Sequence, residues 1–251
     1  MNKRGQVSIF IAVGVIALII VALIFFLRNQ YGFLTPAPSF LGTQLKAVED
    51  NVRTCFDISV APEIKKFGEQ GGGSGNLNSV LYRGRNVPFY CQNIPNNAKC
   101  ANVMPTLDKI NQRLNILVQE KMKECIDESL VEPRAGYSVE NNGLLINTDI
   151  SDGNVLVRLD YDISLTKGET VLPLEPINII VEDTPISDLW DVSHDVVNAL
   201  AANGFFEQIN YMLEKRGNYI INVDKPYPHV IYKINKKDSD FEYWFAVEGE
   251  V

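Results

Sequence analysis

The amino-acid sequence predicts an α+β protein with an N-terminal transmembrane helix, disulfide-linked helices, an antiparallel β-meander, further helices and a C-terminal β-hairpin. Three observations lead to this fold class. An uninterrupted apolar segment stands near the N-terminus, four cysteines follow it, and apolar residues recur first at helical and then at strand spacing. The predicted organisation is a basic leader (1–5), a transmembrane helix (6–28), a stalk (29–42) and an ectodomain (43–251), with a subdivision near residue 184 left open.

The segment between Arg4 and Arg28 contains no charged residue. A helix rises about 1.5 Å per residue, so this segment is long enough to cross a hydrocarbon core of about 30 Å. It exceeds the apolar core of about 7–15 residues found in cleaved secretory signals. Lys3 and Arg4 precede it and only Arg28 closely follows, which places the N-terminus in the cytoplasm and the ectodomain outside the cell. We therefore expect a single-pass protein of the cell membrane; a buried helix of a soluble domain is the alternative.

The charge of the ectodomain limits its partners. All 31 acidic residues follow Arg28, whereas 20 of the 23 basic residues remain once Lys3, Arg4 and Arg28 are set aside, which gives a formal charge of −11. Such a charge argues against nucleic acid or anionic lipid as a partner of the ectodomain. The expected partners are the membrane, through residues 6–28, and a protein or another component of the cell envelope.

The four cysteines predict two disulfides in an oxidising exterior. Cys55 lies on one helical stripe and Cys125 on another, so two helices packed side by side would bring them together. Cys91 and Cys100 would then close a short loop rich in turn-forming residues. Four cysteines allow three pairings, and free thiols remain an alternative. A zinc site is disfavoured, because spacings of 36, 9 and 25 residues match no ordinary finger.

The first part of the ectodomain has helical spacing over residues 43–60. Pro36 and Pro38 in the predicted stalk argue against a helix that runs on from the membrane. Pro62 is expected to break the helix that follows the stalk.

A glycine-rich turn is expected at residues 71–75, and short extended runs near 78–82 and 86–91 predict a β-ribbon. The clearest soluble helix is predicted over 105–130, where one face is apolar throughout.

Residues 136–183 change to strand spacing. Asn142-Gly143 and Asp152-Gly153 stand between strand-like runs, and both dipeptides are typical of hairpin turns. Another strand is expected within residues 170–183, where two prolines place its first half at a sheet edge. These segments predict an antiparallel meander of three or four strands.

Residues 184–215 return to helical spacing, with a break at Asn203-Gly204. Three strands are then expected in the stretches "GNYIINVD", "HVIYKIN" and "FEYWFAVEG". Two of them form the predicted C-terminal hairpin.

Acidic residues are densest at the start of the helix expected after Pro185. Asp188, Asp191 and Asp195 share one helical face, so their oxygens are the candidates for a cation site, with His194 beside them. Acidic residues also favour a helix N-terminus through its dipole, which is the simpler explanation. Ser193-His194-Asp195 is not a catalytic triad, because adjacent helical residues point apart. No nucleophile, metalloprotease or nucleotide-binding motif is present, so we predict no enzyme and no cofactor.

The stretch "KRGQVSIF", residues 3–10, resembles the archaeal class III, or prepilin-type, signal. This resemblance implies cleavage after Gly5, a mature chain that begins at Gln6, and an apolar helix of the kind that packs into the core of a pilin filament. Phe10 departs from the pilin pattern, in which a glutamate is common at that position. The longer chain resembles membrane-anchored surface proteins of small-genome archaea that carry a Cys-bearing helix, a "QGG" and a later Cys-bearing helix; here these are Cys55, Gln70-Gly71-Gly72 and Cys125. That resemblance implies a family but no activity.

Three functions stay open. The first is a non-enzymatic, membrane-anchored surface protein whose ectodomain has a binding or structural role. The second is a pilin-like filament subunit processed after Gly5. The third is a cation-dependent envelope enzyme centred on Asp188, Asp191, His194 and Asp195.

Overall fold

A computed structural model describes residues 15–16, 18–21, 37–73, 77–97, 99–129, 138–167 and 169–249. The chain divides into two compact units, Met1–Gln44 and Leu45–Val251. Most of the predicted transmembrane segment and the predicted processing site at Gly5 and Gln6 lie outside the described residues. Within the described ranges, no helix combines the length and the apolar character needed to cross a bilayer.

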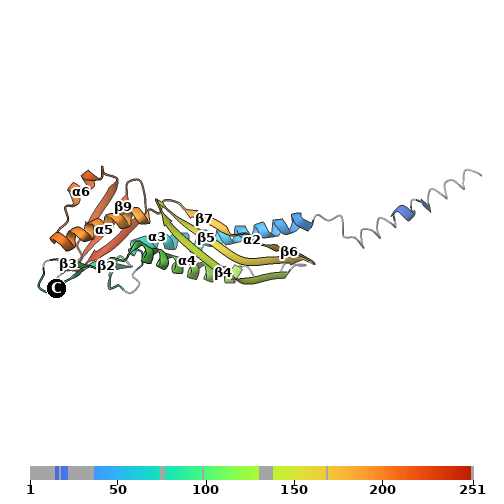
Figure 1. Ribbon diagram of the computed structural model, residues 1–251, viewed down its shortest axis with the longest axis horizontal. Helices are drawn as coiled ribbons and strands as arrows, with labels where there is room; N and C mark the ends of the chain where they lie inside the picture. The colour runs from blue at the N-terminus through green and yellow to red at the C-terminus, as the bar shows by residue number, and fades with distance from the viewer. Residues whose placement is uncertain are drawn as a thin grey trace, which may run out of the picture. The chain divides into compact units, whose positions relative to one another are not determined.

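The unit from Leu45 onward is α+β and contains two sheets, both mainly antiparallel, and two disulfides (Figure 1). The predicted fold class is thus confirmed for this part of the chain. The described helices are α2 (Ala37–Ser59), α3 (Ala61–Glu69), α4 (Leu107–Ser129), α5 (Ile186–Asn203) and α6 (Gln208–Glu214). The described strands are β1 (Ser79–Tyr82), β2 (Arg85–Asn93), β3 (Cys100–Asn102), β4 (Ser138–Ser151), β5 (Asn154–Lys167), β6 (Thr170–Pro173), β7 (Ile177–Val181), β8 (Tyr219–Asp224), β9 (Val230–Lys236) and β10 (Glu242–Val247).

Helix α2 begins earlier than expected, at Ala37, so the end of the predicted stalk is helical. The reason is that Pro38 stands in the first turn, where a backbone N–H has no helical partner in any case. Pro62 acts in the same way at the start of α3, and the chain therefore breaks between α2 and α3 as predicted. After α3, the N–H of Gly72 bonds to Phe67 O and that of Gly71 to Gly68 O, which is a Schellman cap.

The disulfides follow the pairing expected from the helical stripes. Cys55 of α2 is bonded to Cys125 of α4, and Cys91 of β2 to Cys100 of β3. On α4, Ile110, Leu114 and Val118 are fully buried. The first disulfide therefore joins two helices along their buried faces.

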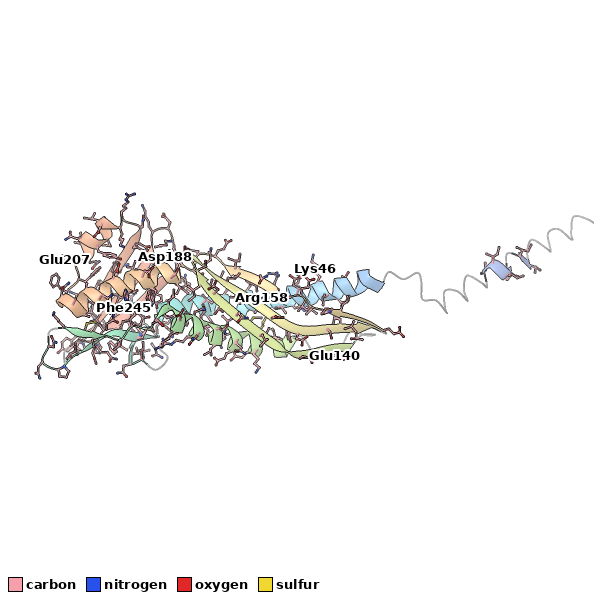
Figure 2. The ribbon with its side chains drawn as sticks, in the orientation of Figure 1. Lys46, Glu140, Arg158, Asp188, Glu207 and Phe245 are labelled. Carbon is pink, nitrogen blue, oxygen red and sulfur yellow. A yellow bond between two sulfur atoms is a disulfide. The ribbon has the colours of Figure 1, made fainter. Side chains whose placement is uncertain are left out.

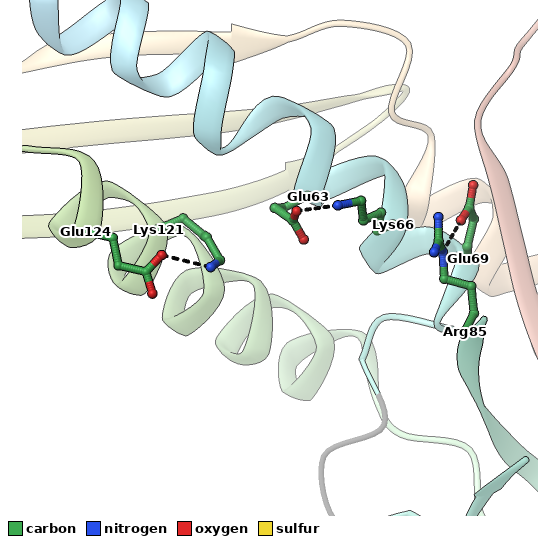
Figure 3. A network of polar contacts seen from close by, with 6 residues as sticks. All are labelled: Glu63, Lys66, Glu69, Arg85, Lys121 and Glu124. Carbon is green, nitrogen blue, oxygen red and sulfur yellow. Dashed lines mark hydrogen bonds and ion pairs between the residues drawn. The ribbon is translucent and has the colours of Figure 1, made fainter. Parts of the chain in front are cut away.

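Figure 3 shows three ion pairs on this part of the molecule. Two are local to one helix, Glu63–Lys66 in α3 and Lys121–Glu124 in α4. The third joins two elements, because Arg85 Nε at the start of β2 lies 2.5 Å from Glu69 Oε2 at the end of α3. This pair links the end of α3 to the start of β2, so it connects the two elements on either side of the glycine turn and β1.

The four-stranded sheet has the order β4-β5-β6, with β7 paired to the other half of β5. Asp152-Gly153 forms the hairpin turn between β4 and β5, as predicted. The prediction of a second hairpin turn at Asn142-Gly143 is wrong, because β4 runs through it and the register shifts between Asn141 and Leu144. Gly143, at φ +128°, allows the chain to form a bulge there instead of reversing.

The six-stranded sheet has the order β1-β2-β10-β9-β8, with β3 also paired to β2. All three C-terminal strands are present, as expected. The pairing of β10 with β2 is parallel and unites the predicted ribbon with the C-terminal strands.

Helix α5 packs on β2, β9 and β10 and also contacts β4 (Figure 1). One hydrophobic core includes Leu159 of the first sheet, Val196 of α5 and Ile234 of the second sheet. Leu45–Val251 forms one compact unit.

Candidate binding surface

The acidic face of α5 is where the sequence indicated a cation site. Asp188 accepts a hydrogen bond from Lys236 Nζ of β9, and Asp195 accepts one from the Tyr211 hydroxyl at 2.7 Å. Asp191 is exposed between them. Within the part of the chain that the structure describes, no three acidic, histidine or cysteine side chains converge as a metal site requires. Asp188 is directed to Lys236 of β9 and Asp195 to Tyr211 of α6, so these two carboxylates face different elements, and the cation site stays a prediction.

His194 has a packing role on the same helix. Its ring stacks on Trp190 with centroids 5.2 Å apart, and Asn198 Nδ2 lies within hydrogen-bonding distance of it. Trp190 Nε1 donates to Pro105 O just before α4. These contacts attach α5 to the segment just before α4 and occupy the His194 ring with Trp190 and Asn198.

Helix α6 follows α5 after the turn at Gly204 and has no buried residue. Phe205, Ile209 and Leu213 are 59%, 68% and 72% exposed. Ile209 and Leu213 are four residues apart and lie on one side of α6, and Phe205 stands just before the helix begins at Gln208. We call these three residues the α6 apolar stripe; contiguous exposed apolar side chains of this size are typical of protein-binding surfaces.

The opposite side of α6 attaches the helix to the domain. Tyr211 donates to Asp195, its ring contacts Phe206 with centroids 5.2 Å apart, and Met212 packs against the core. Burial, followed by the hydrogen bond to Asp195, raises the pKa of Tyr211 well above its ordinary value. The hydroxyl therefore remains a proton donor throughout the physiological range.

Helix α6 also reaches the second sheet. Gln208 Nε2 donates to Ile221 O of β8 at 2.5 Å. Figure 2 shows the region, with Asp188 labelled on α5 and Glu207 at the start of α6. The stripe is thus held away from the core by polar contacts at Asp195 and Ile221, because both are made by the opposite side of α6.

The sequence predicts a helix in this segment but does not indicate that its apolar stripe is exposed. A signal was present in composition, since the segment 205–213 contains five large apolar side chains, Phe205, Phe206, Ile209, Met212 and Leu213, in a helix of only seven residues and the turn before it. A short helix with apolar residues on both sides cannot bury both against one domain.

Comparison with models of known protein families found no match, and neither the curated proteins nor the solved structures searched gave one.

Proposed function

We propose that the chain is a single-pass membrane protein whose extracytoplasmic domain binds another protein through the α6 apolar stripe. It has no enzymatic role in this proposal. The apolar segment of residues 6–28, the acidic ectodomain and the two disulfides support the location. The observation that carries the binding role is the exposure of three large apolar side chains in one short segment, Phe205 just before α6 and Ile209 and Leu213 on it.

The binding free energy that burial of the stripe can supply is sufficient for two partners held in the same membrane. Full burial of a large apolar side chain contributes about 1.5–3 kcal/mol, so three side chains that are already partly covered contribute about 3–6 kcal/mol. This is less than a tight complex in solution needs. Anchoring both partners in one membrane raises their effective concentration and makes such a contact sufficient.

The membrane location is tested on native cells. Extraction of isolated membranes with alkaline carbonate should leave the full-length protein in the pellet. Protease added to intact cells should remove the ectodomain. Recovery of the protein from the soluble cytosol contradicts the proposal.

The binding surface is tested with a photo-activated crosslinker placed at Ile209 in native membranes. The matched control is Leu145 in β4, because it is also a large aliphatic residue and both are 68% exposed. A discrete crosslinked species is expected from position 209 and none from position 145. Equal crosslinking from both positions, or none from position 209, contradicts a specific surface on α6.

A pilin-like filament subunit is the second candidate, and one observation favours it. Helix α2 is 23 residues long and begins at Ala37, within the predicted stalk, so the ectodomain starts with a long helix, as a pilin does. The test is mass spectrometry of the native chain together with electron microscopy of native membranes. Loss of residues 1–5 and an ordered multimer built through residues 6–27 support this candidate, and the absence of the multimer excludes it.

A further inference from the structure

Strand β8 forms an edge of the six-stranded sheet, since β9 is its only neighbour in the strand order. The N–H of Lys237 bonds to Asn218 O just before β8 begins. In an antiparallel pair, backbone groups alternate between facing the neighbour and facing away. Tyr219, Ile221 and Val223 therefore direct their N–H and C=O groups to the free edge.

One side chain covers this edge in the described part of the chain. Gln208 Nε2 of α6 donates to Ile221 O, and the structure gives no other partner there for the outward groups of Tyr219, Ile221 or Val223. Besides this bond, α6 is held by the hydrogen bond from Tyr211 to Asp195 and by the partly buried Met212, and none of its residues is fully buried. Glycines with positive φ stand at both ends of the segment, Gly204 at +82° and Gly217 at +67°.

We propose that the protein partner adds an extended strand to the free edge of β8, with α6 moving aside as a hinged cover. This inference rests on the proposed binding function and names the kind of segment that the partner supplies. The α6 apolar stripe makes the first contact, because it is exposed while the edge is covered. The partner strand then replaces the single Gln208 bond with a ladder of backbone hydrogen bonds.

The chemistry of the edge selects a strand over a helix. Unpaired N–H and C=O groups in a row need a backbone with free groups at the same spacing, and an α-helix uses its own internally. The Ile221 side chain is buried, so an apolar residue of the added strand would pack beside it on the core face of the sheet. Strand β4 is a poorer site, because a register shift interrupts it and Asn111 Nδ2 already donates to Thr148 O.

The test uses the full-length chain in detergent micelles and a synthetic peptide with the sequence of β9, Val230–Lys236, which is the strand that β8 already pairs with. Residue-resolved hydrogen exchange is measured with and without the peptide. The peptide is expected to slow exchange at Tyr219, Ile221 and Val223. A peptide with alternate backbone nitrogens methylated cannot complete the ladder and is expected to have no effect.

Two variants on α6 test the role of the cover. Gln208→Ala removes the bond to Ile221 and is expected to raise the apparent affinity of the peptide about threefold to tenfold. Asn210→Ala changes an exposed residue of the same helix and is expected to leave that affinity unchanged. Absence of protection, equal protection by the methylated peptide, or equal affinities for the two variants overturns the inference.

The two proposals fail separately. If position 209 crosslinks specifically in membranes while the peptide gives no protection, strand addition is excluded and the α6 binding surface stands. If position 209 gives no specific crosslink, the proposed function fails whatever the peptide does.

Discussion

The hydroxyl of Tyr82 in β1 donates a hydrogen bond to the carboxylate of Asp224 in β8, so the two outermost strands of the six-stranded sheet meet. The Tyr82 ring also lies edge-on to Trp244 of β10, with centroids 6.0 Å apart. Beneath it is a second small core, which consists of Val87, Phe89, Ile231, Trp244 and Ala246. This side-chain bridge closes the sheet over its second core at one end, while among the described strands the backbones of β1 and β8 pair only with β2 and β9.

Removal of the Tyr82 hydroxyl is the most direct test of this closure. Tyr82→Phe keeps the ring against Trp244 and loses only the bond to Asp224, so the free energy of unfolding should fall by about 1 kcal/mol. Denaturant unfolding of the purified protein measures the change. Tyr227→Phe is the matched control, because Tyr227 is 89% exposed, and it should change nothing. Equal losses for both variants contradict the closure.

The same carboxylate predicts a dependence on pH. Hydrogen bonds from Lys233, then from Tyr82, hold the pKa of Asp224 below its ordinary value of 3.8. The folded pKa lies below the unfolded one, so the stabilisation is fully present above about pH 4 and is lost as pH falls through the folded pKa. Asp224→Asn should therefore cost about 1 kcal/mol at pH 7, with a cost that shrinks below about pH 4. A cost that stays constant down to about pH 2 contradicts this account.

The elements that the sequence predicted correctly depend on local patterns. In β5, Val155, Val157 and Leu159 alternate with exposed or partly exposed residues and are fully buried, as strand spacing requires. Asp152-Gly153 forms a turn because strands of matching length flank it on both sides. Asn142-Gly143 has the same local chemistry, but its upstream residues continue to pair with β5, and this longer ladder prevails over the turn.

The candidate surface could not be predicted in this way. The parallel pairing of β2 with β10 joins segments that lie far apart in the sequence. Neither segment has a sequence pattern that identifies the other as its pairing partner. The position of α6 depends on that assembled sheet, because Gln208 and Tyr211 bond to residues of β8 and α5. Exposure of the stripe is thus a tertiary property.

The disulfides predict two different losses of stability. Cys55 and Cys125 are 70 residues apart, and replacing both by alanine should lower the free energy of unfolding by about 4 kcal/mol in the chain-entropy model. Cys91 and Cys100 are 9 residues apart, and the same replacement should cost about 2.5 kcal/mol. Denaturant unfolding of the two double variants gives the comparison. A larger loss for the short loop contradicts the entropic explanation.

The glycine turn after α3 predicts a large effect from one methyl group. Gly72 has φ +69°, and a Cβ there would lie 2.7 Å from Ile110 Cγ2. Gly72→Ala should therefore cost about 3 kcal/mol, from the left-handed backbone and the overlap together. Gly84→Ala is the matched control, since Gly84 has φ +76° but open space around it, and it should cost about 1 kcal/mol. Equal costs contradict close packing as the reason for glycine at position 72.

The end of α6 offers a stabilising substitution. Arg216 has φ +56°, and its N–H bonds to Leu213 O while that of Gly217 bonds to Met212 O. This is a Schellman cap with arginine at the left-handed position that glycine prefers. Arg216→Gly should raise the free energy of unfolding by about 0.5–1 kcal/mol, because the side chain is exposed and the strain of the Cβ is removed. Asp238→Gly is the control at φ +68°, where aspartate tolerates the left-handed region better, so its gain should be smaller. A loss of stability in Arg216→Gly would show that the arginine side chain makes a contact that outweighs the strain of its left-handed backbone.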